Sequence, residues 1–223
     1  MGKKFSCINC GVFKCSLGEG NYPKACLTTD EKNDEILQKA ISIYKNNQEV
    51  SKIMISAAQV EGQYYGKLTR IEEIIVFAKK IGAKKIGIAS CMGLIHESKV
   101  FEKILKANGF NTFGVICKVG AKDKSEIGIN EEDKIKPGTH ESMCNPIMQA
   151  LLLNDEKTDL NVINGLCVGH DTLFIKHSEA PVTYLVVKDR VLAHNPIGAL
   201  NTTHSYYERL LKGVNLNEED RKL

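Results

Sequence analysis

Four cysteines stand close together at the start of the chain, in the spacing C-x2-C-x4-C-x10-C. They are Cys7, Cys10, Cys15 and Cys26. A C-x2-C pair can present two sulfurs to one metal from a tight turn, and four thiolates held together without a metal would repel one another. The spacing therefore predicts a metal site that holds either zinc or an iron–sulfur cluster. The alternative is a cysteine-rich tail whose thiols bind nothing.

The other four cysteines are far apart in the sequence, but each lies beside the end of an expected element. They are Cys91, Cys117, Cys144 and Cys167. Three of them follow short apolar runs typical of buried parallel strands, and open α/β sheets bind ligands at the carboxyl ends of their strands. Cys144 opens an expected helix, where the helix N-terminus stabilises a thiolate. We expect the four sulfurs to meet at this edge, although a single cysteine there is more often a small buried apolar residue.

The segment GLCVGHD at 165–171 places ionisable groups beside Cys167. His170 is a candidate either for catalysis as acid or base or for support of the ligands. Asp171 is expected to be a helix N-cap. His140, on a long polar loop, is the second catalytic candidate, because it stands just before one of the cysteines and could gate the site.

Periodicity and turn residues define the elements that must position these groups. The expected helices span residues 31–46, 50–63, 69–81, 98–107, 146–153, 171–177 and 203–211, and the expected strands span residues 85–89, 112–116, 160–163 and 182–187. This alternation predicts an α/β fold with a mainly parallel, Rossmann-like sheet and helices on both faces. We expect a cysteine-rich metal-binding module at 1–29 and an α/β domain at 30–223, with a helical lead-in at 30–82.

Composition narrows the classes of protein. The net charge of +3 is too small to indicate a nucleic-acid partner, and no apolar run approaches the ~20 residues of a membrane span. The start of the chain lacks the apolar core of an export signal, so we expect a cytoplasmic protein with reduced thiols. No Walker loop or G-x-G-x-x-G segment indicates a nucleotide site.

Several segments together resemble one known family: the N-terminal cysteine-rich stretch, GIASCMGL, GVICKVG, MCNPIMQA, GLCVGHD and APVTYLVVKDRVLAHNP. They are similar to an uncharacterised domain-of-unknown-function family of cysteine-rich predicted metal-binding proteins from anaerobic bacteria and archaea. The likeness covers nearly the whole chain. It implies metal binding and a cytoplasmic setting, and it supplies no reaction.

Two all-cysteine quartets favour iron–sulfur clusters, one or two of the 4Fe–4S type, with electron transfer or reductive chemistry as the work of the protein. The expected partners are a redox protein or a small-molecule substrate. Two alternatives stay open at this point. One is a zinc-bound structural or interaction protein, and the other is a thiol-based redox sensor that needs no metal to fold.

Overall fold

The computed structural model describes residues 6–18 and 20–213. Contacts within the chain divide it into two compact units, Met1–Gly66 and Lys67–Leu223. The boundary therefore lies about two thirds of the way along the segment at 30–82 that the sequence predicts as a helical lead-in. The first two helices of that lead-in belong to the unit with the first cysteine quartet, and the third belongs to the α/β unit.

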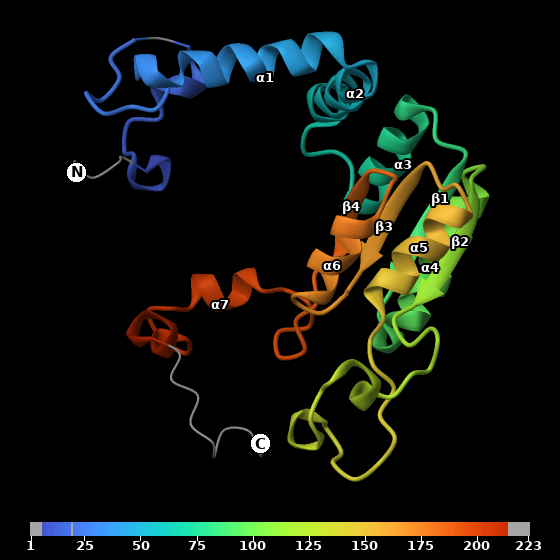
Figure 1. Ribbon diagram of the computed structural model, residues 1–223. Coiled ribbons are helices and arrows are strands. Elements are labelled where there is room, and N and C mark those ends of the chain that lie inside the picture. Colours follow the sequence, from blue (N-terminus) through green and yellow to red (C-terminus); the bar gives the residue numbers. More distant parts are fainter. Residues whose placement is uncertain (1–5, 19, 214–223) are drawn as a thin grey trace. The chain divides into compact units, whose positions relative to one another are not determined.

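The first unit contains the helices α1 (Asp34–Asn46) and α2 (Gln48–Tyr64), as Figure 1 shows. Asn47 separates them in an extended conformation, and its side-chain oxygen accepts a hydrogen bond from Val50 N at 3.1 Å. This bond satisfies one of the free amide groups at the start of α2. Single turns of 3₁₀ helix at Cys7–Asn9 and Lys14–Ser16 precede the pair.

The second unit is built on a four-stranded sheet in the order β2-β1-β3-β4. Its strands are β1 (Lys85–Ser90), β2 (Asn111–Ile116), β3 (Leu160–Asn164) and β4 (Val182–Val186). Every neighbouring pair is parallel. The expected α/β fold with a parallel sheet is therefore confirmed, and all four carboxyl ends point to one edge.

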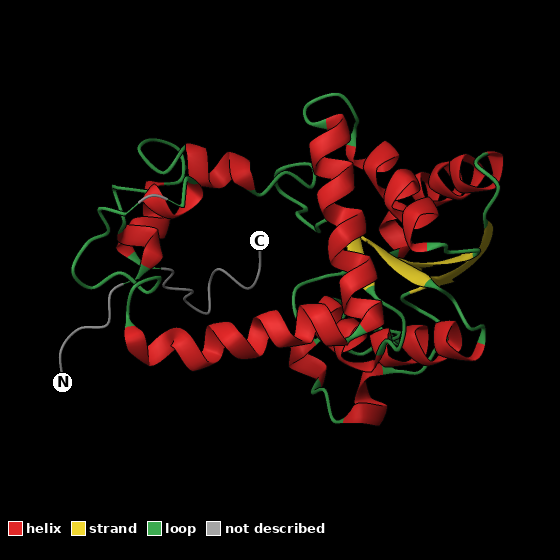
Figure 2. Ribbon diagram, turned by 90° about the horizontal axis from the view of Figure 1, so that it is seen from above, coloured by secondary structure: helices red, strands yellow, loops and turns green. Residues whose placement is uncertain are grey.

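Helices cover both faces of this sheet (Figure 2). They are α3 (Arg70–Ile81), α4 (Ile95–Ala107), α5 (Pro146–Asp155) and α6 (His170–His177). Alternate side chains of β1 divide between two cores: Ile86 and Ile88 pack with α3 and α4, whereas Ala89 packs with α5 and α6. This is the period of two that a strand buried on both faces must have. Within the described part of the chain, no helix is long and apolar enough to cross a membrane.

The prediction of a helix at residues 203–211 is wrong. The chain forms a short helix earlier, α7 (Ile197–Asn201), then turns, and a 3₁₀ segment at Glu208–Lys212. Hydroxyl groups explain the difference. The side chain of Thr202 donates to Gly198 O at 2.7 Å and that of Thr203 donates to Leu200 O at 3.1 Å, and such bonds compete with continued helix.

Close approach of β1 to β3 requires a glycine at position 87. A Cβ atom there would lie 2.0 Å from Asn161 Oδ1 and 2.9 Å from Leu153 Cδ1. Asn161 cannot move away easily, because its side chain is fully buried and bonds Thr158 Oγ1 and Ser178 Oγ, each at 2.8 Å. The buried amide thus occupies the space that any other residue would need.

We therefore expect Gly87→Ala to lower the free energy of unfolding by about 1–3 kcal/mol, the usual cost of overpacking a core. The matched control is Gly114→Ala in the neighbouring strand, where the nearest atoms to a new Cβ, both from Ile88, are 4.0 Å away. Chemical denaturation of both variants measures the difference. Equal unfolding midpoints for the two variants would contradict this account of the packing.

Candidate functional site

The carboxyl edge of the sheet brings cysteines together. Cys91 directly follows β1 and Cys117 directly follows β2, in a register that pairs Ser90 with Ile116. Together with Cys144 and Cys167, they line a single cavity of about 960 Å³. The structure thus places all four cysteines of the second quartet around one space, and their role as ligands stays a prediction.

Backbone hydrogen bonds hold three of these cysteines in position. The amide of Cys91 donates to Asn164 O at 3.1 Å, and the amide of Cys117 donates to Ser90 O at 2.8 Å. Both bonds continue the parallel ladder one residue past the strands. The amide of Asn145 then donates to Cys117 O at 2.7 Å, which ties the segment carrying Cys144 to the same edge.

The thiols of Cys91, Cys117 and Cys144 form a hydrogen-bonded chain with Cys117 in the middle. A hydrogen bond from Cys117 is the main reason that the pKa of Cys91 falls to about 5, and the Gly93 amide and Lys188 lower it further. The pKa of Cys144 falls to about 4, first through Cys117 and then through His170. Conversely, the pKa of the Cys117 thiol is raised, because its one proton is shared with the Cys144 and Cys91 thiolates and because the thiol is buried.

These sulfurs also accept bonds from the backbone. The amide of Met92 donates to Cys117 Sγ at 3.3 Å, and the amide of Gly93 donates to Cys91. Both amides belong to the turn that connects β1 to α4. Amide groups turned toward sulfur stabilise thiolates and also tune thiolate-bound clusters.

Cys167 has a different hydrogen-bond partner, Arg190. Arg190 Nη2 donates to Cys167 Sγ at 2.9 Å. This contact raises the pKa of the Arg190 guanidinium, and the more distant Cys91 and Cys144 add to the effect. Arg190 therefore offers the cavity a permanent positive charge.

His170 begins α6, and its side chain contacts the Cys144 sulfur. It is therefore the one candidate catalytic histidine that reaches the thiols. The expectation for Asp171 is wrong: Gly169 is the N-cap of α6, and Asp171 lies in the first turn. Its carboxylate accepts bonds from Thr172 N at 2.8 Å and from the Tyr184 hydroxyl at 3.1 Å, so its role is structural. Burial and Asp171 together raise the pKa of Tyr184 to about 12.

His140 does not line the cavity. Its ring is 61% exposed and lies 3.4 Å from Asp123 Oδ2 and 3.0 Å from Ser142 Oγ. The loop that carries it, however, forms one wall of the cavity through other side chains, including Ile129 and Met143.

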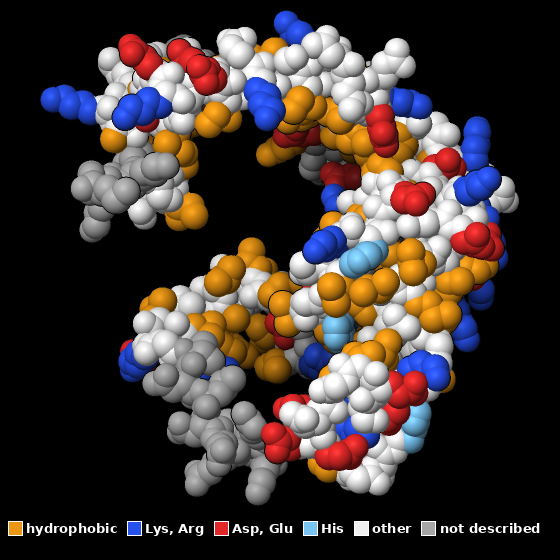
Figure 3. Space-filling model, viewed as in Figure 1, with side chains coloured by type: hydrophobic (Ala, Val, Ile, Leu, Met, Phe, Trp, Pro, Cys, Tyr) orange, Lys and Arg blue, Asp and Glu red, His pale blue; other side chains and the backbone are white. Residues whose placement is uncertain are grey.

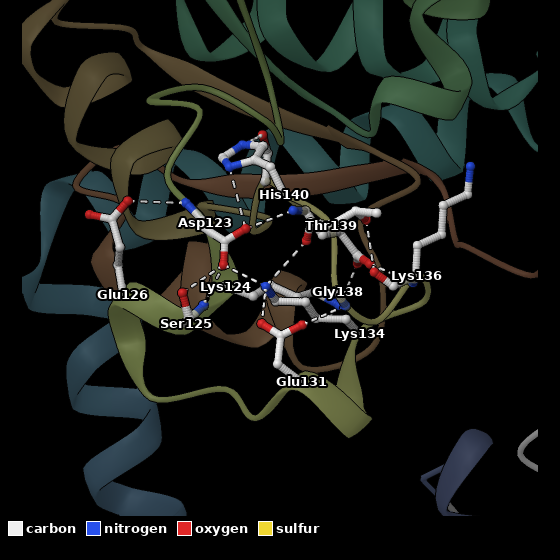
Figure 4. A network of polar contacts seen from close by, with 12 residues as sticks. Asp123, Lys124, Ser125, Glu126, Glu131, Lys134, Lys136, Gly138, Thr139 and His140 are labelled. Carbon is white, nitrogen blue, oxygen red and sulfur yellow. Dashed lines mark hydrogen bonds and ion pairs between the residues drawn. The ribbon is translucent and has the colours of Figure 1, made fainter.

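An ion-pair network holds this loop in shape (Figure 4). Lys134, whose side chain is 4% exposed, reaches Asp123 at 2.8 Å and Glu131 at 2.5 Å. The pKa of Asp123 is held well below its ordinary value, first by Lys134 and then by hydrogen bonds from Ser125. A second pair, Lys124 with Glu141 at 2.6 Å, closes the base of the loop. A long loop without its own apolar core thus has a defined conformation.

The buried side-chain amide of Gln149 bonds backbone carbonyls next to the thiols. Gln149, on α5, is fully buried, and its Nε2 donates to Val115 O at 2.7 Å and Ser90 O at 3.2 Å. These carbonyls lie near the ends of β1 and β2: Ser90 directly precedes Cys91, and Val115 stands two residues before Cys117. Gln149 therefore fixes the distance between the two strand ends.

Sequence reasoning missed the residues that surround the sulfurs. Gln149 stands in the apolar run PIMQALLL, where one polar residue in a buried helix is a signal that it has a buried partner. Lys188 and Arg190 stand within four residues of the end of the last strand, in VVKDR. Their position at the carboxyl edge was the available signal.

The first quartet is more open. Cys7 and Cys15 are exposed, Cys10 is half-buried and Cys26 is buried. Amide groups of Phe13 and Val12 donate to the Cys10 sulfur and lower its pKa. Across the described residues of both units, no three cysteine, histidine or acidic side chains are placed so that they could hold one metal ion as they stand. Metal binding at either quartet would therefore require side-chain rotation.

We expect Lys134→Met to raise the pKa of Asp123 toward the ordinary value near 3.9, because the largest cause of the lowering is removed. Since the folded pKa lies below the unfolded one, the Asp123 contribution to stability is complete above the ordinary pKa. It is lost as pH falls through the lowered value. A carbon-13 NMR titration of the side-chain carboxyls measures the shift. Lys122→Met is the control, because Lys122 is 62% exposed and pairs with Glu126 at 3.0 Å instead of with Asp123. An unchanged pKa of Asp123 in Lys134→Met would refute the proposed role of Lys134 in the ion-pair network.

Comparison with known proteins places these residues in a family. A family model described as a protein of unknown function (DUF1847) matches residues 26–185, which include Cys26 and the whole second quartet. The uncharacterized protein MJ0455 of Methanocaldococcus jannaschii is 48% identical over 190 residues, which cover 85% of this chain and 95% of that protein. No solved structure matches the chain. The chain belongs to the DUF1847 family of proteins of unknown function.

Proposed function

We propose that this protein is an iron–sulfur protein that performs electron transfer or reductive chemistry in the cytoplasm. Its working centre is the carboxyl edge of the sheet, with Cys91, Cys117, Cys144 and Cys167 as ligands. The observation that carries the proposal is the convergence of these four residues, from four separate segments, on one cavity. A packing role for each cysteine would not require that convergence.

The chemistry of the donor set supports a thiophilic group. All four candidate ligands are sulfurs, and thiolate sets bind zinc or iron–sulfur clusters in preference to hard cations such as magnesium. Cys91 and Cys144 have lowered pKa values and so offer thiolates at neutral pH. Binding would require Cys117 to release its proton and Cys167 to turn from Arg190. When bound, a cluster supplies one-electron transfer.

The size of the cavity favours a cluster over structural zinc. Structural zinc sites are closed tetrahedra that leave no open coordination position. The space here is about 960 Å³, which is within the range of cavities that bind small molecules. A cofactor at the sulfur end of this cavity would leave room for a substrate or for the approach of a redox partner protein.

Charged neighbours have defined tasks in this proposal. Arg190 and Lys188 lie beside the sulfurs and offset the negative charge of a thiolate-bound group. His170, in contact with Cys144, can hold or release a proton beside the reacting molecule. The Met92 and Gly93 amides keep two sulfurs oriented.

The first quartet is proposed as a second metal site. Cys7 and Cys10 lie at the two ends of one turn, in which the Cys10 amide donates to Cys7 O at 3.1 Å. Amides of the following residues point to the Cys10 sulfur. Cys15 and Cys26 complete the set, and the shared thiolate chemistry admits a cluster or zinc at this site.

Metal and sulfide analysis after anaerobic purification tests the proposal. We expect iron and acid-labile sulfide in stoichiometric amounts, a brown protein and a cluster signal in electron paramagnetic resonance after reduction. Cys117→Ser should remove the iron of the sheet edge and leave the metal of the first quartet. Cys10→Ser should remove the metal of the first quartet and leave the iron of the sheet edge. His96→Ala, on the exposed side of α4, is the control and should change neither. Stoichiometric zinc without iron or sulfide would refute the proposal.

One observation favours a second candidate, a thiol redox function. Cys117 is a protonated thiol in hydrogen-bonding contact with two thiolates, the arrangement of a dithiol ready for oxidation. A peroxide would oxidise the Cys91 thiolate and the Cys117 thiol to a disulfide, taking two electrons and releasing one water and one hydroxide. Thiol counts on metal-free, folded protein before and after peroxide test this: a loss of two thiols that Cys117→Ser abolishes supports it, and no loss contradicts it.

A further inference from the structure

The cavity at the carboxyl edge has chemically different contributors. The turns after the strands supply sulfurs and cations, among them Cys91, Lys188 and Arg190. The loop between β2 and α5 supplies the apolar side chains Ile127, Ile129, Ile135 and Met143, and also Asp133 and the paired Lys124 and Glu141. A cavity built in this way offers a ligand both a charged end and an apolar end.

The apolar side chains of the loop are held in water by a rigid frame. Ile135 is 85% exposed and Ile127 is 59% exposed. Their loop cannot easily collapse to bury them, because Lys134 is bound by two carboxylates and the Ile135 amide donates to Glu141 at 2.7 Å. Exposed apolar side chains that are fixed around a cavity are typical of ligand-binding surfaces.

The cations at the sulfur end are not neutralised by acidic residues. In the part of the chain that the structure describes, no carboxylate lies within ion-pair distance of Lys118, Lys188 or Arg190, all of which line the cavity. Lys124, from the loop, is different, because Glu141 pairs with it. Three cations therefore face the two thiolates Cys91 and Cys144 at the sulfur end, so that positive charge exceeds negative charge there. The apolar surface lies where the loop is.

Exposed hydrophobic side chains also occur on this unit away from the cavity. Figure 3 shows them gathered over α5 and α6, among charged and polar groups. Leu151, on α5, is 55% exposed but does not line the cavity. It provides a comparison for the loop residues, because a substitution there removes similar apolar surface away from the proposed site.

We infer that the cavity binds a small organic anion with an apolar body, such as a medium-chain carboxylate. The anionic group lies at Lys188 and Arg190, and the apolar body lies against the isoleucines of the loop. This inference rests on the proposed function for its location and names the substrate class of the same site. The volume of about 960 Å³ accommodates such a molecule beside a thiolate-bound group.

Calorimetric titration of the full chain, purified anaerobically, tests the inference with four probes. Octanoate has both features, octanol has only the body, acetate has only the charge, and octylammonium has the opposite charge. We expect octanoate to bind at least about tenfold more tightly than each of the others, the effect of a charge-assisted hydrogen bond or of a buried apolar chain. Comparable affinities for octanoate and octylammonium, or no octanoate binding, would overturn the inference.

Variants locate the two ends of the ligand. Arg190→Gln and Lys188→Gln should each weaken octanoate about tenfold and leave octanol unchanged, since only the charge is lost. Ile135→Asn should weaken the binding of both octanoate and octanol. Because Ile135 is exposed, the variant should unfold at the same denaturant midpoint as the native chain, which chemical denaturation checks. The controls are Lys122→Gln and Leu151→Asn, which lie outside the cavity lining and should bind as the native chain does. Octanoate binding that none of the three site variants weakens would place the ligand elsewhere and overturn the inference.

Iron and sulfide measured on the same samples separate the two ideas. Selective octanoate binding without iron or sulfide would sustain the anion site and refute the iron–sulfur centre. Iron and sulfide in stoichiometric amounts without selective octanoate binding would do the opposite.

Discussion

Parallel pairing of β1 with both β2 and β3 is the constraint on which the rest of the α/β unit depends. Neighbouring strands lie about 4.8 Å apart, so residues that follow two such strands start from adjacent positions. The ladder continues past the strands through Cys117 N to Ser90 O and Cys91 N to Asn164 O. Contact between the thiols is a consequence of this backbone pairing, and Gln149 secures it from beneath by bonding two carbonyls near the strand ends.

Placing thiols in contact at a partly buried edge has an electrostatic consequence. The pKa values of Cys91 and Cys144 fall well below that of an ordinary cysteine, whereas Cys117, between them, keeps its proton. The neighbouring amides and cations stabilise the resulting charge. Iron–sulfur ligation and disulfide formation both need thiolates. The same geometry therefore supports iron–sulfur binding as the proposed function and thiol redox chemistry as the alternative.

The loop between β2 and α5 solves a separate physical problem. A segment with few apolar contacts would normally be mobile, and a mobile wall cannot shape a cavity. Here a nearly buried lysine, held by two carboxylates, takes the place of an apolar core. Because the ion pairs stabilise the loop, its isoleucines can line the cavity instead of packing against one another.

Local patterns in the sequence determined the element types and the parallel sheet, because periodicity and turn residues act over a few positions. They also indicated which cysteines belong at the carboxyl edge, since strand ends can be located from apolar runs. The C-terminal helix could not be predicted, because Thr202 and Thr203 divert the backbone by local bonds that periodicity does not register. The partners of the sulfurs were decided by tertiary structure alone. Arg190 meets Cys167, and Cys117 meets Cys91 and Cys144, only because strands distant in sequence end side by side.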